Sequence, residues 1–369
     1  MSHAFVTTYA NSWPPSKQTA EDGVNVTFRT LKYGDLTVTP IMECGDYSFG
    51  AEVAGVAWDK PVADHIVKQL VELQDKYAVL VFRNTGLDNA GHIAFSQQLG
   101  SKLETNPFYY GRENDRVGEP FLWDVSNMEL DGSLVKEDSR RWHHSLGNAL
   151  WHTDSSYHQQ RSKYSLLLSH GNPKRGGVWT HFADTRRAYA DLPAETKDRL
   201  NGLVVEHDLW HSRLLGSPSV YKAPTDRERA LKPPAYHNLV QKAPNGQKTL
   251  YLAAHAKRIL GLDPPMESSP DANCTAEAED PRAIERSQAL IWQLIHHCTQ
   301  PQYVFSLEWL DGGDLVWWDN RQSMHRANPY TSTMGARDVR RSTVIDDGPL
   351  AWGVSSDVKE FAVVRAEGC

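Results

Sequence analysis

One histidine and one aspartate stand two positions apart in the stretch Leu150-Trp151-His152-Thr153-Asp154. If this stretch is extended, His152 and Asp154 project to the same face, because strand side chains alternate with a period of two. One imidazole and one carboxylate on one face supply two ligands of a two-histidine, one-carboxylate metal site. An H-x-D pattern is common by chance in a chain with 16 histidines, so the motif alone is weak evidence for a metal.

The third ligand has to come from another part of the chain. The segment Gly313–Arg321 has the pattern of a turn followed by a buried apolar strand, and it leads to His325. A short loop after that strand would place His325 at the mouth of a sheet, beside the first two ligands. Other histidines compete for the role or belong to a helical pattern: His143, His144, His158, His170, His181, His296 and His297.

Two arginines follow the candidate histidine. If residues 337–343 form a strand, Arg337 and Arg341 share one face with Val339 and Thr343. Two inward guanidinium groups are unfavourable unless each meets an anion, and arginine can hold a carboxylate through two parallel hydrogen bonds. A solvated basic edge strand explains the same pattern, so an anion site stays one of two interpretations.

Short strand patterns separated by turns predict a β-sandwich or jelly roll with flanking helices. The predicted strands are Ala78–Phe82, Tyr164–Ser169, Val178–Phe182, Gly202–Glu206, Lys248–Ala253, Tyr303–Trp309, Asp314–Trp318 and Ser342–Ile345. The predicted helices are Val62–Leu73, a helix from an Asp88 cap to Leu99, Ala188–Leu200 and Ile284–His297.

We expect one domain over residues 26–369, preceded by a polar extension at residues 1–25. The acidic, proline-rich segment Leu262–Pro281 is interpreted as a surface insertion. Residues 101–150 are irregular, and a stretch of that length within a domain is typical of a functional lid.

The composition argues against several classes of partner. A net charge of −7 disfavours nucleic acid, and the chain has no apolar run of about 18 residues that could span a membrane. No secretory signal is visible, and the four cysteines are far apart, which favours free thiols in a reducing, cytoplasmic compartment over disulfides or a thiol zinc site.

Taken together, these motifs make the chain similar to a known family. It resembles the taurine / 2,4-dichlorophenoxyacetate dioxygenase family, and within it the 2,4-dichlorophenoxyacetate branch. The resemblance rests on an H-x-D motif, a later threonine, a distant histidine and an arginine shortly after that histidine. These elements fall here at His152 and Asp154, Thr180, His325 and Arg337. Supporting stretches are residues 49–56, 78–83, 124–127, 148–157 and 318–321.

The resemblance implies a double-stranded β-helix core and a set of site residues. His152, Asp154 and His325 would be the catalytic iron ligands, and 2-oxoglutarate would chelate Fe(II) beside O2. Thr180 and Arg337 would hold the far carboxylate of 2-oxoglutarate. The positions that match the substrate side are Arg341, Asn148 and His255, and Arg341 would meet an anion of the primary substrate.

The expected function is therefore hydroxylation of a small carboxylate or sulfonate by an Fe(II)- and 2-oxoglutarate-dependent dioxygenase. Hydroxylation of a carbon that bears an ether oxygen would also cleave an aryloxyalkanoate-like compound. The alternatives are a non-catalytic metal-binding β-sandwich that acts as a sensor and a zinc hydrolase that uses the same triad. A homo-oligomer is compatible with the sequence.

Overall fold

The computed structural model describes residues 29–59, 61–106, 116–173, 178–260, 262, 281–310, 312–328 and 335–354. The extension expected at residues 1–25 and nearly all of the expected insertion at 262–281 lie outside these residues. No helix in the described part of the chain is both long and apolar enough to cross a membrane.

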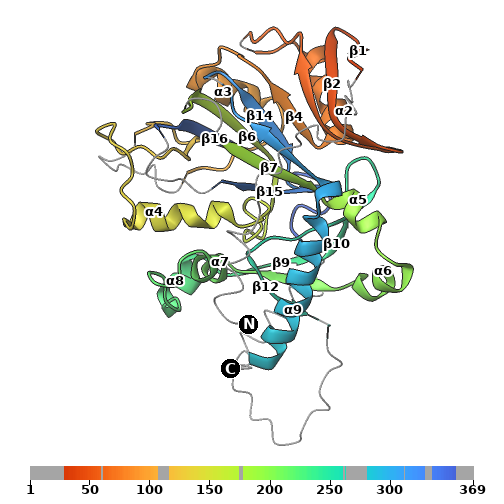
Figure 1. Cartoon of the computed structure of the whole chain (residues 1–369), viewed down its shortest axis with the longest axis vertical. Helices are drawn as coiled ribbons and strands as arrows, with labels where there is room; N and C mark the ends of the chain where they lie inside the picture. Colours follow the sequence, from red (N-terminus) through yellow and green to blue (C-terminus); the bar gives the residue numbers. More distant parts are fainter. Residues whose placement is uncertain are drawn as a thin grey trace, which may run out of the picture.

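The largest sheet has eight strands in the order β1-β2-β3-β4-β14-β6-β16-β5 (Figure 1). Its members are β1 (Leu31–Tyr33), β2 (Leu36–Cys44), β3 (Tyr47–Ala54), β4 (Val79–Phe82), β5 (Trp123–Asp124), β6 (Ser162–Gly171), β14 (Leu315–Asp319) and β16 (Asp338–Ile345). Every residue of β4 and β14 is buried, which agrees with their continuous apolar sequences, because a strand covered on both faces has no polar side.

Three smaller sheets complete the β-structure. The sheet β13-β7-β15 is formed by β13 (Val304–Glu308), β7 (Trp179–Asp184) and β15 (Ser323–Ala327), and the sheet β12-β8-β9 by β12 (Ala256–Leu260), β8 (Val204–His207) and β9 (Ala235–Asn238). The strands β10 (Val240–Lys242) and β11 (Lys248–Leu250) form a hairpin.

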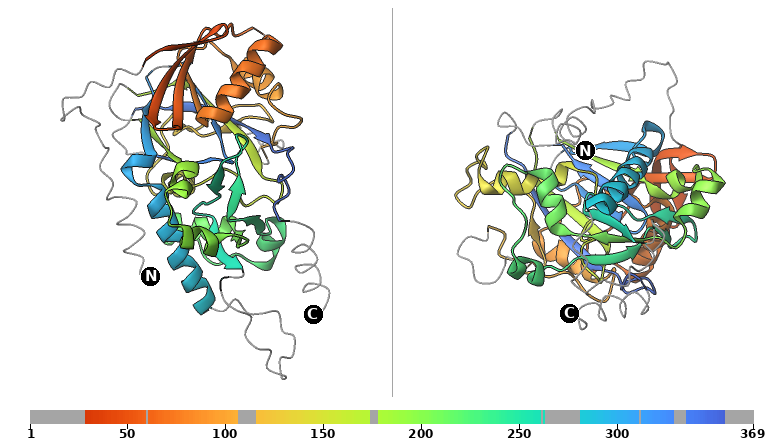
Figure 2. Two further views of the ribbon diagram at one scale, coloured as in Figure 1. Left: turned by 90° about the vertical axis from the view of Figure 1, so that its right-hand side faces the viewer. Right: turned by 90° about the horizontal axis from the view of Figure 1, so that it is seen from below.

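Helices pack against the sheets, among them α2 (Asp64–Tyr77), α3 (Asn89–Gln97) and α9 (Pro281–Cys298). The other helices of the described residues are α4 (Arg140–Ser145), α5 (Thr185–Ala190), α6 (Ala194–Leu200), α7 (Leu209–Gly216) and α8 (Asp226–Leu231), with short 3-10 turns η1 (Leu146–Ala149) and η2 (Pro301–Tyr303). Figure 2 shows α2 beside the N-terminal strands, at the opposite end of the molecule from α9.

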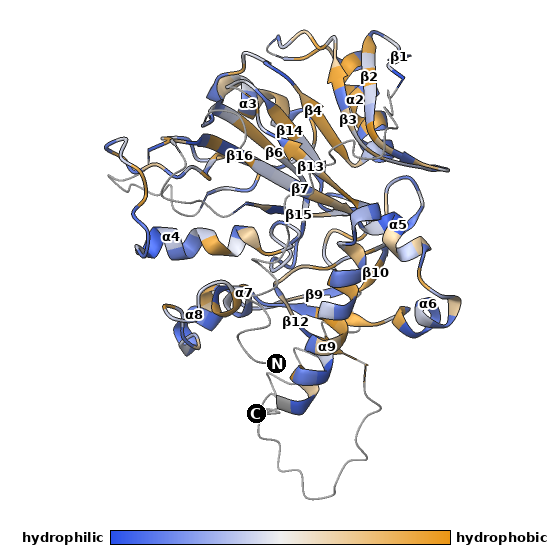
Figure 3. Ribbon diagram, in the orientation of Figure 1, coloured by the Kyte–Doolittle hydropathy of each residue, from blue (hydrophilic) through white to orange (hydrophobic). Residues whose placement is uncertain are grey.

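The core has three layers. Leu80, Trp317 and Leu166 of the large sheet pack with α2 and α3, and the opposite face of that sheet packs against Phe182 and Phe305 of the sheet β13-β7-β15. A third cluster fills the space between that small sheet and α9. In Figure 3 this helix has an apolar side and a hydrophilic side, as expected for a helix that covers a core on one face.

Most predicted elements are confirmed, with shifted ends. Asp88 caps α3, because its carboxylate accepts a hydrogen bond from the Gly91 backbone N–H at 2.7 Å. The single helix predicted over Ala188–Leu200 is wrong, because the segment forms α5 and α6 with Pro193 between them. Proline has no N–H to continue the hydrogen-bond ladder of α5, and it occupies the N-cap of α6 instead. The strand predicted over Lys248–Ala253 ends at Leu250.

A buried arginine ties the two packed sheets together. Arg186 is 1% exposed and makes two hydrogen bonds to the Asp184 carboxylate, at 2.9 and 3.0 Å. It also donates to the carbonyl of Ser48 in β3 and to the carbonyl of Lys76 in α2. One side chain therefore bonds the end of β7 to the large sheet and to its covering helix.

Replacing Arg186 with methionine should destabilise the protein by about 3–5 kcal/mol, because it leaves the buried Asp184 carboxylate without its cation. The free energy of unfolding from urea titration measures this effect. The control is Arg199→Met on the exposed surface of α6, which should stay within about 0.5 kcal/mol of wild type. Equal free energies of unfolding for the Arg186 variant and wild type would contradict the role of Arg186 in joining the two sheets.

Candidate active site

His152, Asp154 and His325 come together as a possible metal-binding group, with one ligand atom from each residue and all three atoms within 4.8 Å of one another. The Nε2 atoms of His152 and His325 lie 3.6 and 3.7 Å from the two oxygens of Asp154. All three residues are buried. Among the described residues this is the one group of three or more histidine, cysteine and acidic side chains with such spacing.

The backbone sets this geometry. His325 lies within β15, and His152 pairs with it as an isolated antiparallel bridge. The His152 N–H donates to the His325 carbonyl at 2.9 Å, and the His325 N–H donates to the His152 carbonyl at 2.8 Å. Asp154 follows two residues later, at the start of a turn, and its carboxylate lies beside both imidazoles.

Neighbouring polar groups orient two of the ligands. The Nδ1 atom of His152 lies 2.7 Å from the Leu150 carbonyl, so Nδ1 carries the proton and Nε2 keeps a lone pair for a metal. Asp154 accepts a hydrogen bond from the Ser165 hydroxyl at 2.7 Å, and Asn320 donates to that same hydroxyl at 2.9 Å. The Asp154 backbone N–H donates to Asn320 Oδ1 at 3.2 Å.

The ionisation states suit a metal site. Burial, together with the nearby His152, lowers the pKa of His325 to about 3. Burial disfavours the charged form of Asp154, but Arg341 and His325 outweigh it and hold the Asp154 pKa well below its usual range. A neutral imidazole and an ionised carboxylate are the forms that bind metal. Two imidazoles with one carboxylate fit Fe(II), because this set leaves coordination positions open on one side of the ion.

A small cavity beside the triad contains the residues expected to hold 2-oxoglutarate. Thr180, Arg337 and His325 line it together. Arg337 is 2% exposed, and its guanidinium lies 5.3 Å from the ring centre of Trp309. The Trp309 indole donates to the Thr180 hydroxyl at 2.9 Å, and because an indole only donates, this hydroxyl keeps its own proton for an acceptor.

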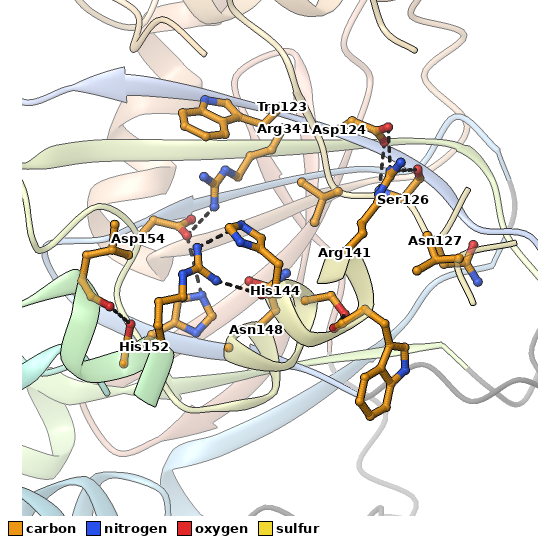
Figure 4. A pocket seen from close by; sticks show the side chains of 18 of the residues that line it. Trp123, Asp124, Ser126, Asn127, Arg141, His144, Asn148, His152, Asp154 and Arg341 are labelled. Atoms are coloured by element: carbon orange, nitrogen blue, oxygen red, sulfur yellow. Dashed lines mark hydrogen bonds and ion pairs between the residues drawn. The ribbon is translucent and has the colours of Figure 1, made fainter. Parts of the chain in front are cut away.

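A larger cavity of about 360 Å³ also borders the triad, at His152 and Asp154 (Figure 4). It contains the three residues that were expected on the substrate side, Asn148, His255 and Arg341. Arg341 also lines the small cavity, and it donates a hydrogen bond to Asp154. The Nδ1 atom of His255 lies 3.0 Å from the Ser156 hydroxyl. Arg341 is thus engaged by a triad residue rather than directed only toward a substrate.

Several residues of this cavity were not singled out from the sequence. They include Trp123, Arg141, Tyr157 and Arg213. Trp123 directly precedes the family-like stretch at residues 124–127, and that stretch is the one sequence signal for this wall of the cavity. No pattern in the sequence points to Arg213.

The other candidate histidines have partners away from the triad. His143 bonds to Ser217 and Asp138, and His181 contacts Ser306 and Asn328, each at 2.7 Å from one of its ring nitrogens. His297 lies 2.7 Å from the Ala188 carbonyl, as expected for a scaffold residue.

Comparison with known proteins now identifies the family. Residues 37–343 match the family described as "Taurine catabolism dioxygenase TauD, TfdA family". The chain belongs to this family. An alpha-ketoglutarate-dependent 2,4-dichlorophenoxyacetate dioxygenase of Burkholderia sp. (strain RASC) is 33% identical over 80% of this chain and 91% of its own length. A (S)-phenoxypropionate/alpha-ketoglutarate-dioxygenase of Sphingobium herbicidovorans is 31% identical over 78% of this chain and 89% of its own.

A solved structure agrees with this result. The crystal structure of AAD-2 in complex with Mn(II) and N-oxalylglycine has a TM-score of 0.68 and 32% identity, and the match covers 85% of this chain and 98% of that one. The jelly-roll core is confirmed, and the protein is an oxidoreductase that uses Fe(II), 2-oxoglutarate and O2. These findings support the dioxygenase interpretation and not the sensor or the zinc hydrolase.

Removing the Ser165 hydroxyl should weaken Fe(II) binding by about 10- to 100-fold, because the residues that orient a metal ligand have effects of this size. Anaerobic equilibrium dialysis of Ser165→Ala with Fe(II) measures the affinity. Ser169→Ala is the matched control, since it removes a buried hydroxyl from the same face of β6 and should leave Fe(II) affinity unchanged. Unchanged affinity in both variants would contradict the role given to Ser165.

Proposed function

We propose that this dioxygenase hydroxylates a small organic anion, a carboxylate or sulfonate, in the larger cavity. His152, Asp154 and His325 would hold the iron, and Thr180 with Arg337 would hold the far carboxylate of 2-oxoglutarate. The observation that carries the proposal is the position of two arginines, four residues apart, at the two cavities that meet at the triad. The relatives named above act on aryloxyalkanoates, which are anions of this kind.

The division between two cavities explains how two acids could bind at once. Arg337 lines only the small cavity, whereas Asn148 and Arg341 line both. Arginine binds a carboxylate through two parallel hydrogen bonds, and a buried guanidinium is stabilised by an anion. A co-substrate carboxylate at Arg337 would leave the larger cavity to the primary substrate.

The chain's own residues prepare the site for oxidation. Bound iron and 2-oxoglutarate would supply the oxidising chemistry that activates O2 for attack on a substrate C–H bond. The ring of His325 packs 4.7 Å from the Trp318 ring centre and 6.0 Å from that of Phe182. These apolar side chains exclude water from one side of the triad, while Arg341 keeps Asp154 ionised. Positioning of the substrate beside the triad is then the main contribution of the protein.

Ether cleavage would follow from the same chemistry. A hydroxyl placed on a carbon that bears an ether oxygen gives a hemiacetal, which breaks down to an alcohol and a carbonyl compound. We propose aryloxyalkanoate-like compounds as one class of substrate on this ground.

We also propose a cytoplasmic location and a single catalytic domain over residues 26–369, with a homo-oligomer allowed. Cys44 is exposed and Cys298 is buried, and both are free thiols, which supports a reducing compartment.

Succinate release tests the proposed function. The purified enzyme, with Fe(II), O2 and 2-oxoglutarate, is incubated with a panel of small carboxylates and sulfonates, including aryloxyacetates, and with the primary amide of each acid. We expect succinate release to rise with one or more acids and not with the matching amides. Stimulation by uncharged compounds alone would overturn the assignment of an anionic substrate.

Replacing Arg337 with methionine should raise the KM for 2-oxoglutarate by about 10- to 100-fold, because a charged hydrogen-bond partner is lost. The KM for the primary substrate should change less. Arg340→Met is the matched control, since Arg340 lies in β16, which begins directly after Arg337, but bonds to Asn89 and Asp338 instead of lining either cavity. An unchanged KM for 2-oxoglutarate in the Arg337 variant would contradict its assignment.

A further inference from the structure

Three arginines line the larger cavity, and they differ in their partners. Arg141 pairs with Asp124 at 2.9 Å and with Glu129 at 3.2 Å. Arg341 pairs with Asp154. Arg213 instead donates to the His144 carbonyl at 2.8 Å and to the His144 ring nitrogen Nε2 at 2.9 Å. Within the part of the chain that the structure describes, no carboxylate forms an ion pair with Arg213.

His144, the hydrogen-bond partner of Arg213, does not neutralise the positive charge of the guanidinium. Burial and the adjacent Arg213 together lower the pKa of His144 to about 3, so this imidazole is neutral and its Nε2 accepts the hydrogen bond from Arg213. Burial also lowers the pKa of Arg213 itself, which reflects the cost of its charge in this environment. A cation in such a place is stabilised when an anion binds beside it.

The fold holds Arg213 firmly against the segment that leads to the triad. The side chain comes from α7, whose N-terminus is capped by Asp208 through a hydrogen bond from the Trp210 N–H at 2.8 Å. At the other end of α7, Gly216 packs so closely that a Cβ there would lie 3.2 Å from the Gly147 nitrogen in η1. Gly216 and Gly147 have no side chains, so the α7 backbone packs closely against η1. The turn η1 ends shortly before His152 in the chain.

Arg213 and Arg341 therefore approach the cavity from different elements. Arg341 belongs to β16 of the large sheet, whereas Arg213 belongs to α7, which lies on the far side of α4 and η1 from that sheet (Figure 1). Arg341 already has Asp154 as a partner, and the buried Glu104 is a second carboxylate within its electrostatic reach. Of the two arginines, Arg213 is the one whose charge is left for a ligand.

We propose that Arg213 binds an anionic group of the primary substrate, at a subsite on the α7 wall that is separate from Arg341. This inference rests on the proposed function and assigns the specificity for an acid to a residue outside the family motif. Carboxylate, sulfonate and sulfate groups share the chemistry required, since each presents oxygens that accept from a guanidinium. The carbon to be oxidised then lies toward the triad, with the anion at the far end of the substrate.

The test compares an acid with its neutral amide. The probes are 2,4-dichlorophenoxyacetate and its primary amide, or whichever other acid of the panel the wild type turns over. We measure kcat/KM for acid and amide in wild type, Arg213→Met and Arg213→Lys. The acid-to-amide ratio should fall by about 10- to 100-fold in Arg213→Met, because one charged hydrogen-bond partner is removed. Arg213→Lys should recover part of the ratio, since lysine keeps the charge without the planar fork.

A merely structural role for Arg213 predicts a different result. If the side chain only joins α7 to His144, Arg213→Met should lower kcat/KM for acid and amide equally, and that outcome would overturn the proposal. Arg227→Met on the exposed surface of α8 is the matched control for the loss of one positive charge, and its ratio should equal that of wild type. Thermal unfolding of each variant shows whether it is folded.

The proposed function can fail separately. If wild type releases no succinate with any acid, that result contradicts the proposed function, and the inference is then tested by binding. Acid and amide are titrated calorimetrically into the anaerobic Fe(II) and 2-oxoglutarate complex of wild type and Arg213→Met. A selective loss of acid binding in the variant supports the subsite, and equal affinities of the two proteins for the acid overturn it.

Discussion

Two backbone hydrogen bonds between His152 and His325 hold the site together. They pair the strand segment that carries the H-x-D motif with β15, so two imidazoles far apart in the sequence meet with their rings 4.3 Å apart. Asp154 follows His152 by two residues, and its carboxylate lies beside both imidazoles. Both packed sheets contribute to this arrangement, because β15 belongs to the small sheet while Ser165, which orients Asp154, belongs to the large one.

Charge balance is the second constraint on the site. The triad places a buried carboxylate beside two imidazoles, and Arg341 supplies the cation that keeps Asp154 ionised. The pairing reduces the positive charge that Arg341 can offer to a ligand. Arg213 differs from Arg341, because its hydrogen bonds to His144 satisfy donors of the guanidinium without supplying a negative charge. Electrostatic pairing thus distinguishes Arg341, which is paired with a triad carboxylate, from Arg213, which we propose as the substrate anion's partner.

The sequence predicted the elements and the triad better than the walls of the cavity. Apolar periodicity located α2 and α9, the Asp88 cap located α3, and the motif spacing found His152, Asp154 and His325. The missing N–H of Pro193 predicts a break between α5 and α6. The helical periodicity on both sides of Pro193 nevertheless favoured one continuous helix. Arg213 could not be found, because its importance depends on which carboxylates lie beside it after folding, and no sequence period encodes that.

The most direct test of the central claim is whether His152 holds the iron that 2-oxoglutarate chelates. Anaerobic addition of Fe(II) and 2-oxoglutarate to wild type should give a weak visible charge-transfer band, and the band should be absent from His152→Ala. His181→Ala removes another buried histidine, which bonds to Ser306 and Asn328, and it should keep the band. A band of wild-type intensity and affinity in His152→Ala would contradict the account.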